Sequence, residues 1–414
     1  MHVLIVGGGL GGLGLAQCLR KQGISFEVFE RDEDAQSRFQ GWAIGIHTII
    51  EKLQSSFPSD MATLKDATDH LQPLDLPAQM GLYFPGRPGR MGVEDTPEHP
   101  IVRSERHRLR EWLSTNIPIQ WGKRVVSIDH NDAGVQVSFE DGTTASGDIL
   151  VGADGINSGV REHILQKPAK DVLKLVPLAA IVGEVTLEGD AFVRQLELGH
   201  SAYVYASPDL GFWNFNGLHH VLPGGRSGKH YWMLMQPDAT VESPDHWLQS
   251  ATQEQKHEHV MKLIANMPPR FRELFEATPA SGIKKEAHVW RDLELDTQGG
   301  LPASRVMLVG DAAHAMTPFR GEGGYHSFID AMNLCQTLVS LKEGDKYKDV
   351  SVVKPAVDEY NKEMLQRGGD AVRSSRNENS AKRTSDTKTK FTTANQMVRS
   401  LPEVPIVLDK VIKA

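Results

Sequence analysis

Three glycines near the start of the chain have the spacing of a phosphate-binding loop. Gly7, Gly9 and Gly12 follow the apolar run His2–Val6 and fit the pattern G-x-G-x-x-G. Glycine at these places permits a tight turn, a close approach of the backbone to a pyrophosphate, and close packing of the next helix on the strand. The N–H groups at the start of that helix favour bound phosphate. Glu30 lies 18 residues beyond Gly12, near the place expected for an acid that binds an adenosine ribose.

The glycine pattern alone leaves two alternatives open. Glycine-rich turns are common, so the bare motif suits a purely structural strand-to-helix turn as well as a nucleotide site. The strand before it, the helical pattern after it and the acid at the right distance favour dinucleotide binding. These residues do not distinguish FAD from NAD(P).

Two later segments each contain an apolar strand that ends in glycine and aspartate. The first runs through Ile149–Val151 to Asp154 and Gly155, and the second ends at Gly310 and Asp311. Taken alone, the first could be an ordinary strand-to-turn connection. The turn after the second segment contains Pro318, Gly321, Gly323 and Gly324, and a helix is predicted from about Tyr325 to Leu341.

Together these segments resemble a known family, the single-component FAD-dependent aromatic hydroxylases and monooxygenases of the para-hydroxybenzoate hydroxylase type. The three motifs occur in the family's order over most of the first 340 residues: the glycine loop with Glu30-Arg31, then Asp154-Gly155, then Gly310-Asp311 with the glycine-rich helix start. Arg103, expected to open a helix over Arg103–Leu113, matches a fourth and looser family element. The stretch after Phe319 is similar to that of fungal secondary-metabolite members.

The resemblance implies FAD as the cofactor and assigns the residues that hold it. It places the glycine loop on the pyrophosphate, Glu30 on the adenosine ribose, Arg103 on the phosphate or ribityl region, and Asp311 on the ribityl hydroxyls. Asp154-Gly155 connects FAD contacts to the pyridine-nucleotide region, and Val126 is placed loosely against adenine. The expected cofactor-binding residues are Gly7, Gly9, Gly12, Glu30, Arg31, Arg103, Val126, Asp154, Gly155, Asp311, Pro318, Gly321, Gly323 and Gly324.

The resemblance also implies the reaction. NAD(P)H, with NADPH favoured over NADH, would reduce the flavin as a transient co-substrate, since no second glycine motif predicts a separate domain for it. O2 would then form a flavin hydroperoxide that hydroxylates or epoxidises a small aromatic or polycyclic substrate in an apolar, water-excluding pocket. Arg31 and Arg38 are candidates for the coenzyme phosphates, although two solvated arginines would look the same. No catalytic base is identified.

The chain departs from the family pattern at the start of the third helix. Tyr325 stands where the family usually has an asparagine, and Arg320 and Glu322 bring charge close to the expected flavin ring. The two charges either face solvent or shape the substrate and flavin geometry. An oxidase or halogenase on the same scaffold is one alternative. A non-catalytic flavin-binding protein is a second alternative, which this departure leaves open.

We expect an α/β fold: a Rossmann-like FAD-binding domain with an inserted antiparallel β-sheet substrate domain and a C-terminal helical segment. The expected boundaries are 1–75, 98–170 and 300–345 for FAD binding, 76–97 and 171–299 for the substrate domain, and 346–414 for the helical segment. A polar helix is predicted over Val357–Lys382, with an interruption at Gly368-Gly369.

Four aromatic residues alternate within two predicted strands of the substrate domain. They are Tyr203, Tyr205, Trp213 and Phe215. Alternation places each pair on one face of the sheet, because successive side chains of a strand point to opposite sides. The pairs either form an aromatic surface opposite the flavin or belong to ordinary sheet core, and the second is favoured because aromatic residues are common in strands.

The composition excludes several classes of function. The 414-residue chain has 45 Lys and Arg against 53 Asp and Glu, a net charge of −8 that argues against a general nucleic-acid binder. Cys18 and Cys335 cannot form a disulfide framework, no Cys/His cluster predicts a metal site, and no stretch predicts a membrane span. Only Met1 precedes the first strand, so we expect no signal peptide and a cytoplasmic monomer or homodimer.

Overall fold

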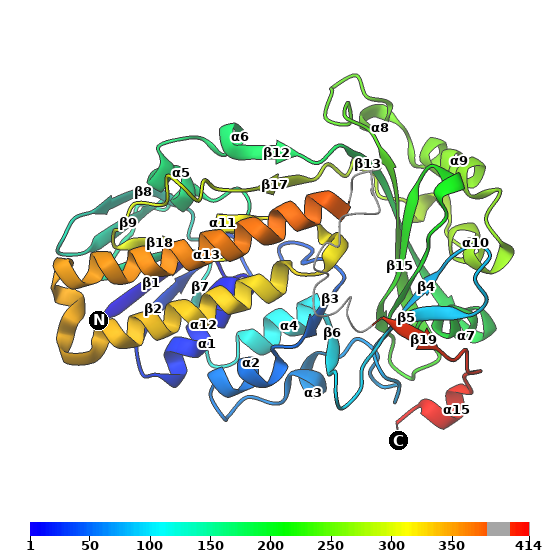
Figure 1. Ribbon diagram of the computed structural model, residues 1–414, viewed down its shortest axis with the longest axis horizontal. Coiled ribbons are helices and arrows are strands. Elements are labelled where there is room, and N and C mark those ends of the chain that lie inside the picture. The colour runs from blue at the N-terminus through cyan, green and yellow to red at the C-terminus, as the bar shows by residue number, and fades with distance from the viewer. Residues whose placement is uncertain (379–397, 414) are drawn as a thin grey trace.

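A computed structural model describes residues 1–378 and 398–413 of the chain (Figure 1). Its first domain contains a five-stranded sheet in the order β18-β11-β1-β2-β7, in which all neighbouring strands are parallel. These strands are β1 (His2–Val6), β2 (Ser25–Phe29), β7 (Ile119–Gln120), β11 (Ile149–Gly152) and β18 (Val306–Leu308). Their apolar runs are buried, as expected of a parallel sheet that helices cover on both faces.

Helices cover this sheet and connect its strands. Figure 1 shows the long helices α12 and α13 lying side by side along the first domain. The helices of this part are α1 (Leu10–Lys21), α2 (Ile50–Ser56), α3 (Leu64–Thr68), α4 (Arg106–Leu113), α5 (Gly159–Leu165), α6 (Ala169–Val172), α11 (Asp311–His314), α12 (Gly323–Lys342) and α13 (Val350–Glu378). Their packing places the carboxyl ends of β1, β11 and β18 at one edge of the sheet, beside the starts of α1, α5 and α11.

Small sheets complete this domain and its connection to the second. β3 (Ala43–His47) pairs with β6 (Ile101–Glu105), and β12 (Leu173–Leu175) pairs with β17 (Arg291–Leu293). A three-stranded sheet contains β8 (Val125–His130), β9 (Val135–Phe139) and β10 (Thr144–Gly147). Short 3-10 helices include η3 (Pro318–Arg320) and η4 (Glu343–Lys348).

The second domain is built on a seven-stranded sheet in the order β13-β16-β15-β14-β4-β5-β19 (Figure 1). Its strands are β4 (Gln79–Tyr83), β5 (Arg90–Glu94), β13 (Leu178–Glu188), β14 (Ala202–Tyr205), β15 (Trp213–Val221), β16 (Ser227–Pro237) and β19 (Arg399–Leu401). All pairs are antiparallel except β14 with β4, which is parallel. The exact domain boundaries expected from the sequence stay a prediction.

One face of this sheet packs against helices and the other is turned toward the first domain. The helices are α7 (Gly189–Leu198), α8 (Trp247–Ser250), α9 (Gln253–Ile264) and α10 (Pro269–Glu276), with α15 (Leu408–Val411) near the C-terminus. Phe192, Phe271 and Phe275 are buried in the core between helices and sheet, separately from the core around the parallel sheet. The two domains therefore have separate hydrophobic cores and meet at one junction.

The C-terminal segment differs from the helical segment expected from the sequence. α13 is continuous through Gly368, where an interruption was predicted. A Cβ atom at Gly368 would lie 2.4 Å from Cδ2 of His314, so glycine here serves close packing rather than a helix break. Beyond α13, β19 pairs with β5 and extends the seven-stranded sheet. Residues 379–397 lie outside the described residues.

Candidate active site

A cavity of about 2040 Å³ lies at the junction of the two domains. Sites for a single small molecule usually occupy about 300–1000 Å³, so this cavity has room for an elongated cofactor and a second ligand. Its walls come from the loops at the carboxyl edge of the parallel sheet, from β3, and from the inner face of the seven-stranded sheet. The motifs separated in the sequence therefore meet in one space.

The first glycine loop forms one end of the cavity. Gly7 has φ +115°, and a Cβ there would lie 2.2 Å from the carbonyl oxygen of Ala153. At Gly9 a Cβ would meet no atom within 4 Å, and Gly9 precedes α1 without any side-chain cap. The first N–H groups of α1 are thus left for a ligand. Gly12 does not line the cavity. A Cβ at Gly12 would lie 2.0 Å from the carbonyl oxygen of Gly7, so glycine here lets α1 pack closely against the loop.

Glu30 is buried beside the glycine loop and holds its shape. Its carboxylate accepts hydrogen bonds from the N–H of Gly8 at 2.9 Å and of Asp32 at 3.1 Å. Arg110, on α4, donates to the carbonyl of Gly8 at 2.9 Å and stands 3.5 Å from Glu30. Arg110 was not anticipated from the sequence; its spacing of four from Arg106 on one helix is the signal that could have found it.

The loop after β11 turns beside the glycine loop. Asp154 lines the cavity, but its carboxylate accepts hydrogen bonds from the Ser158 hydroxyl at 2.5 Å and the Val160 N–H at 3.2 Å. Burial raises the pKa of Asp154. Gly155 has φ +79° and faces open space, so the turn exposes backbone to the cavity. Asp154 is therefore fixed by its own loop, and Gly155 provides the accessible surface.

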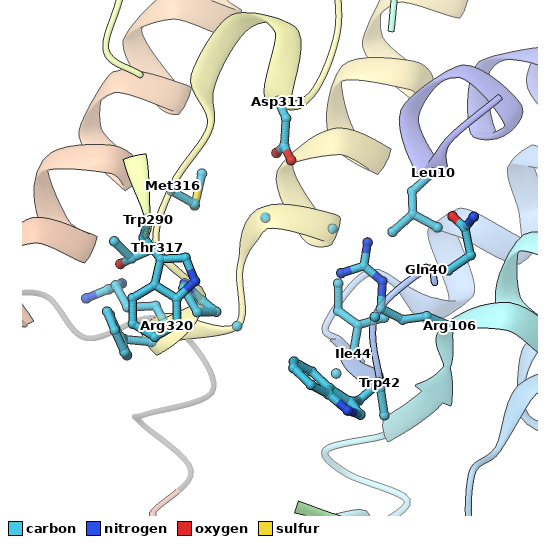
Figure 2. Close-up of a pocket in the computed structure, with 18 of the residues that line it drawn as sticks. Leu10, Gln40, Trp42, Ile44, Arg106, Trp290, Asp311, Met316, Thr317 and Arg320 are labelled. Atoms are coloured by element: carbon cyan, nitrogen blue, oxygen red, sulfur yellow. The ribbon is translucent and has the colours of Figure 1, made fainter. Parts of the chain in front are cut away.

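Asp311 and Arg106 project into the middle of the cavity from opposite sides (Figure 2). Burial raises the pKa of Asp311, and burial lowers the pKa of Arg106, while the attraction between the two charges opposes both shifts. Within the described ranges, the Arg106 guanidinium has neither a hydrogen bond nor an ion pair with protein. Such a cation is suited to a ligand that carries oxygen atoms or negative charge.

The start of α12 forms the opposite wall. Gly321, Gly323 and Pro318 line the cavity with Met316 and Thr317, and Figure 2 shows this wall facing Leu10, Gln40, Trp42 and Ile44. A Cβ at Gly324 would lie 2.6 Å from Cδ1 of Ile44, so glycine is required for β3 to approach. No side chain caps this helix either, so its N–H groups face the cavity.

The two charges near this helix are buried. Arg320 and Glu322 are each 4% exposed, and the Arg320 Nε donates to the Glu322 carboxylate at 2.8 Å. The alternative in which they face solvent is wrong. Because the two charges pair with each other, neither is buried alone, and burial becomes less costly. The sequence pattern does not show this pairing. Tyr325 packs against His47, with ring centroids 5.9 Å apart.

The helix after β6 begins later than the sequence suggested, which changes one assignment. Arg103 does not open a helix; it lies in β6, and α4 begins at Arg106 because the Glu105 side chain accepts hydrogen bonds from the N–H groups of His107 and Arg108. Arg103 lines the cavity on the side of the seven-stranded sheet, where its Nη2 donates to the Tyr231 hydroxyl at 2.6 Å. Arg106 takes the position toward the loops of the first domain.

Val126, expected near adenine, is not among the residues that line the cavity, and its side chain is 60% exposed. Its neighbours Val125, Arg124 and Lys123 do line the cavity. Successive side chains of a strand point to opposite sides, so Val125 and Val126 face different surroundings. The other expected residues that line the cavity are Gly7, Gly9, Glu30, Arg31, Arg103, Asp154, Gly155, Asp311, Pro318, Gly321, Gly323 and Gly324.

The four predicted aromatics divide between the two faces of the sheet. Trp213 and Phe215 line the cavity. Tyr203 and Tyr205 face the other way and pack on Phe271, with Tyr205 stacked at 4.5 Å. Both interpretations therefore apply, each to one pair. The further apolar residues of the cavity face are Met80, Leu82, Phe84, Val93, Val204, Met233 and Met235.

The cavity wall is positively charged although the whole chain carries −8. The cationic lining residues are Arg31, Arg38, Arg103, Arg106, Arg110, Lys123, Arg124, Lys284 and Arg320, and the acidic ones are Glu30, Asp154, Glu286 and Asp311. Arg31 is exposed at the cavity, and Arg38 pairs with Asp32 at 2.6 Å. Positive charge concentrated in a cleft attracts phosphate-bearing ligands.

These features fit FAD. Two uncapped helix starts, glycines whose Cβ positions are open to the cavity, and Arg106, whose guanidinium has no protein partner among the described residues, all line one elongated space. The first helix start suits a pyrophosphate, and the second suits the polar edge of a flavin ring.

Comparison with known proteins decides the family. The model of the FAD binding domain family matches residues 106–375, and that of the NAD(P)-binding Rossmann-like domain matches residues 5–43. The FAD-dependent monooxygenase thnD of Trichoderma harzianum is 56% identical over 91% of this chain and 92% of its own length. The chain belongs to the FAD-dependent monooxygenases.

This monooxygenase has more distant fungal relatives and solved structural neighbours. The FAD-dependent monooxygenase phnB of Penicillium herquei is 26% identical over 90% of this chain and 88% of its own. A crystal structure of an FAD-containing monooxygenase from Photorhabdus luminescens has a TM-score of 0.72 at 25% identity, covering 91% and 98% of the two chains. HpxO of Klebsiella pneumoniae, solved with FAD and uric acid, shares the fold, with a TM-score of 0.67 at 20% identity over 91% and 87%.

The enzyme is thus an FAD-containing oxidoreductase with the fold of the para-hydroxybenzoate hydroxylase type. None of the helices in its described part has the length and apolar character that crossing a bilayer requires.

Behind the cofactor loops, a buried charge network joins α11, α12 and α13. Asp330 accepts hydrogen bonds from the Gly310 N–H and pairs with His314, both at 2.7 Å, and its other oxygen accepts from Arg367 at 2.6 Å. The neighbouring carboxylate of Asp330 raises the pKa of His314 against the effect of burial. His314 is therefore a structural residue behind the Gly-Asp turn.

Proposed function

We propose that this enzyme uses NAD(P)H and O2 to insert one oxygen atom into a small aromatic or polycyclic substrate. The overall reaction converts substrate, O2, NAD(P)H and a proton into oxygenated substrate, NAD(P)+ and water. Bound FAD supplies the redox chemistry, accepting a hydride and activating O2. The observation that carries the proposal is the apolar, partly aromatic sheet face, with Trp213 and Phe215, which lines the same cavity as the cofactor loops.

In this proposal, different residues of the chain bind different parts of the cofactor and coenzyme. The Gly7–Gly9 loop and Arg106 hold the FAD phosphates, and Asp311 binds the ribityl hydroxyls. The uncapped start of α12 at Gly323 would place its N–H groups near a bound flavin ring, where such donors would stabilise negative charge. Arg31 and Arg38 meet the phosphates of the visiting NADPH.

The sheet face of the second domain supports a planar apolar substrate and the exclusion of water. Exclusion of water protects a reactive oxygen donor from hydrolysis, so the apolar wall suits an oxygenase. The product is a hydroxylated or epoxidised molecule.

The first test is reduction of the purified FAD-loaded enzyme by NADPH under anaerobic conditions. We expect the flavin absorbance to bleach, faster with NADPH than with NADH. The second test is a screen of aromatic and polycyclic compounds under 18O2 with product mass measured. A mass gain of one labelled oxygen supports the proposal, whereas oxidised product without label would show an oxidase. A flavin that NADPH never bleaches, with any compound of the screen, would show a non-catalytic flavoprotein.

A further inference from the structure

The chain has two cysteines, and both are buried at the contact between the same two helices. Cys18 lies on α1 and is 2% exposed, and Cys335 lies on α12 and is 6% exposed. Both are free thiols, and neither of them lines the cofactor cavity. The proposed reaction gives no role to either thiol, so their meeting in one apolar contact calls for a separate explanation.

Small residues let α1 and α12 pack closely from their first turns onward (Figure 1). A Cβ at Gly11 would lie 3.7 Å from the Cβ of Ser327, and a Cβ at Gly14 would lie 3.6 Å from the Cβ of Ala331. From the first pair to the second, both helices advance by one turn in the same direction, which is the spacing of one helix face. The two helices are therefore parallel, and these faces stay in contact.

One turn further along both helices, the two thiols meet. Cys18 follows Gly14 by four residues, and Cys335 follows Ala331 by four residues. A hydrogen bond joins the two thiols. A disulfide needs Cβ atoms about 3.5–4.5 Å apart, and the helix spacing at Gly14 and Ala331 already lies within this range. The two sulfur atoms are therefore placed to be joined without separating the helices.

The two thiols differ in their reactivity. The hydrogen bond with Cys335 and burial raise the pKa of Cys18, whereas the same hydrogen bond lowers the pKa of Cys335 against the effect of burial. Cys18 is thus the donor in this contact, and its proton stabilises negative charge on the Cys335 sulfur. Because the thiolate is the form of cysteine that attacks an oxidant, Cys335 is the thiol expected to react first, with Cys18 in contact as the second.

We propose that Cys18 and Cys335 form a reversible disulfide when hydrogen peroxide oxidises the enzyme. The Cys335 sulfur attacks one peroxide oxygen, the O–O bond breaks, and water leaves with the Cys335 proton, which gives a sulfenic acid. The Cys18 sulfur then attacks the Cys335 sulfur, and the hydroxyl group leaves as a second water with the Cys18 proton. Two thiols and one H2O2 become one disulfide and two waters, and two thiols of a reducing compound reverse the change.

The proposed function supplies a source of this oxidant. When no substrate accepts the oxygen atom, NAD(P)H, O2 and a proton balance to NAD(P)+ and H2O2. This source rests on the proposed function, whereas the formation of the disulfide does not. Oxidation of the pair would then follow from turnover without a substrate.

The cross-link would join the two helices whose starts suit the pyrophosphate and the flavin ring. α1 begins at the glycine loop, and α12 begins at the opposite wall of the cavity. A disulfide between Cys18 and Cys335 closes a loop that contains most of the chain, which restricts the unfolded state and keeps the two helices together. We therefore expect the oxidised enzyme to retain FAD at urea concentrations that release it from the reduced enzyme.

The test adds hydrogen peroxide to the FAD-loaded enzyme in the absence of NADPH and substrate. Catalase then removes the peroxide, the chain is unfolded, its free thiols are alkylated and counted, and peptide mapping locates any cross-link. We expect the count to fall from two thiols to none and to return to two after treatment with dithiothreitol. Because the chain has no other cysteine, a disulfide within one chain joins Cys18 to Cys335.

Two matched alanine variants assign the roles of the thiols. Cys18→Ala leaves no second thiol, so Cys335 should proceed to sulfinic acid under the same treatment. Cys335→Ala removes the attacking thiol, so Cys18 should react with peroxide at least about tenfold more slowly than Cys335 does in Cys18→Ala. Peroxide should increase the retention of FAD in urea only in the unmodified enzyme.

The outcomes separate this inference from the proposed function. Two thiols that stay free in folded, FAD-loaded enzyme after prolonged treatment with excess peroxide would overturn the disulfide. Loss of thiols to sulfinic acid without a cross-link, or a disulfide between two chains, would overturn it as well. A cross-link that leaves FAD retention in urea unchanged would overturn the stabilising effect assigned to it. Bleaching by NADPH is measured separately, so none of these results decides the proposed function.

Discussion

At the scale of single residues, the arginines that line the cavity differ in how their charge is neutralised. Arg320 is paired with Glu322, and this pair belongs to the protein alone. Arg106 and Arg103 have no carboxylate partner among the described residues. Since an uncompensated buried charge is destabilising, these two positions are where a bound anion would contribute the most. Arg106 faces the cofactor loops, and Arg103 faces the substrate sheet.

Replacing Arg106 tests the first of these positions. Arg106→Met keeps the length and apolar contacts of the side chain but removes its charge and hydrogen bonds. We expect the dissociation constant of FAD to rise by about tenfold to a hundredfold, as for loss of a charge-assisted hydrogen bond worth about 1.5–3 kcal/mol. FAD titration followed by protein fluorescence measures it.

Arg108→Met is the control for this change. Arg108 lies on the same helix but not in the cavity, and it donates to the carbonyl of Asp69 at 2.9 Å. Its FAD affinity should stay within twofold of the unmodified enzyme's, an allowance of about 0.4 kcal/mol. Equal FAD affinity in Arg106→Met would show that the cofactor phosphates lie elsewhere.

At the scale of elements, the last long helix supports the cofactor site, although none of the described residues that line the cavity belongs to it. α13 packs on α11 through His314 and supplies Arg367 to Asp330. Asp330 in turn holds the Gly310 N–H at the turn that presents Asp311. The position of Asp311 therefore depends on the fit of a helix that begins 39 residues later, at Val350.

Two adjacent glycines of α13 provide a test of this dependence. Alanine normally stabilises a helix by about 1 kcal/mol relative to glycine. At Gly369 the nearest atom to a new Cβ would be 3.4 Å away, at the end of the flexible Arg373, so Gly369→Ala should be neutral or stabilising. At Gly368 the Cβ would lie 2.4 Å from the buried His314 ring, so Gly368→Ala should lower both the melting temperature and the FAD content.

The comparison of the two variants separates helix propensity from packing. Urea denaturation and the ratio of FAD to protein absorbance measure the two effects. Stabilisation of similar size in both variants would contradict the close packing of His314 on α13.

At the scale of the whole molecule, the site exists only where the two domains meet. Trp42, from the first domain, donates to Glu184 of the second and stacks on Tyr231. Cofactor loops line one side of the cavity and the sheet lines the other. Binding of FAD should therefore stabilise the folded chain as a unit. Removal of FAD is expected to lower the melting temperature, and a hundredfold excess of FAD over its dissociation constant should restore about 3 kcal/mol. Differential scanning calorimetry of the stripped and reloaded enzyme measures this change.

Buried histidines predict that the fold is sensitive to acid. Burial lowers the pKa of His230 to about 4, and the ordinary value is about 6.5. Protonation therefore favours the unfolded chain, so this stability is fully present above pH 6.5 and is lost as pH falls toward 4. Between pH 7 and pH 5 this histidine alone should cost about 2 kcal/mol of unfolding free energy.

His230→Gln should accordingly weaken the pH dependence of stability. Urea unfolding with excess FAD at pH 7 and pH 5 measures the difference, and His99→Gln, at an exposed turn, is the control. The slope will not vanish, because burial also lowers the pKa of His220 to about 4 and of His326 to about 3. An unchanged slope in His230→Gln would contradict the burial of a neutral imidazole at this position.

The parts of the site that were predictable are those set by local geometry. A glycine such as Gly7 or Gly9 is needed because of its own backbone and immediate neighbours, so the motif is visible in the sequence. The helix expected from Arg103 begins at Arg106 instead, because the Glu105 side chain caps α4. The sequence contains several arginines in this stretch, and their pattern does not indicate at which of them the helix begins. Arg110 was missed for the same reason.

The amino-acid sequence alone indicated a dinucleotide-binding strand, glycine turn and helix, because these follow from contacts within a few residues. Its resemblance to a known family then implied FAD and the α/β fold. The tertiary structure decided which residues of each local pattern line the cavity and which are buried elsewhere. Strand alternation pairs Trp213 with Phe215 and Tyr203 with Tyr205, but only the packing of α10 on one face leaves the first pair for the cavity. Contacts between residues distant in the chain depend on where whole elements pack, and no local pattern encodes that position.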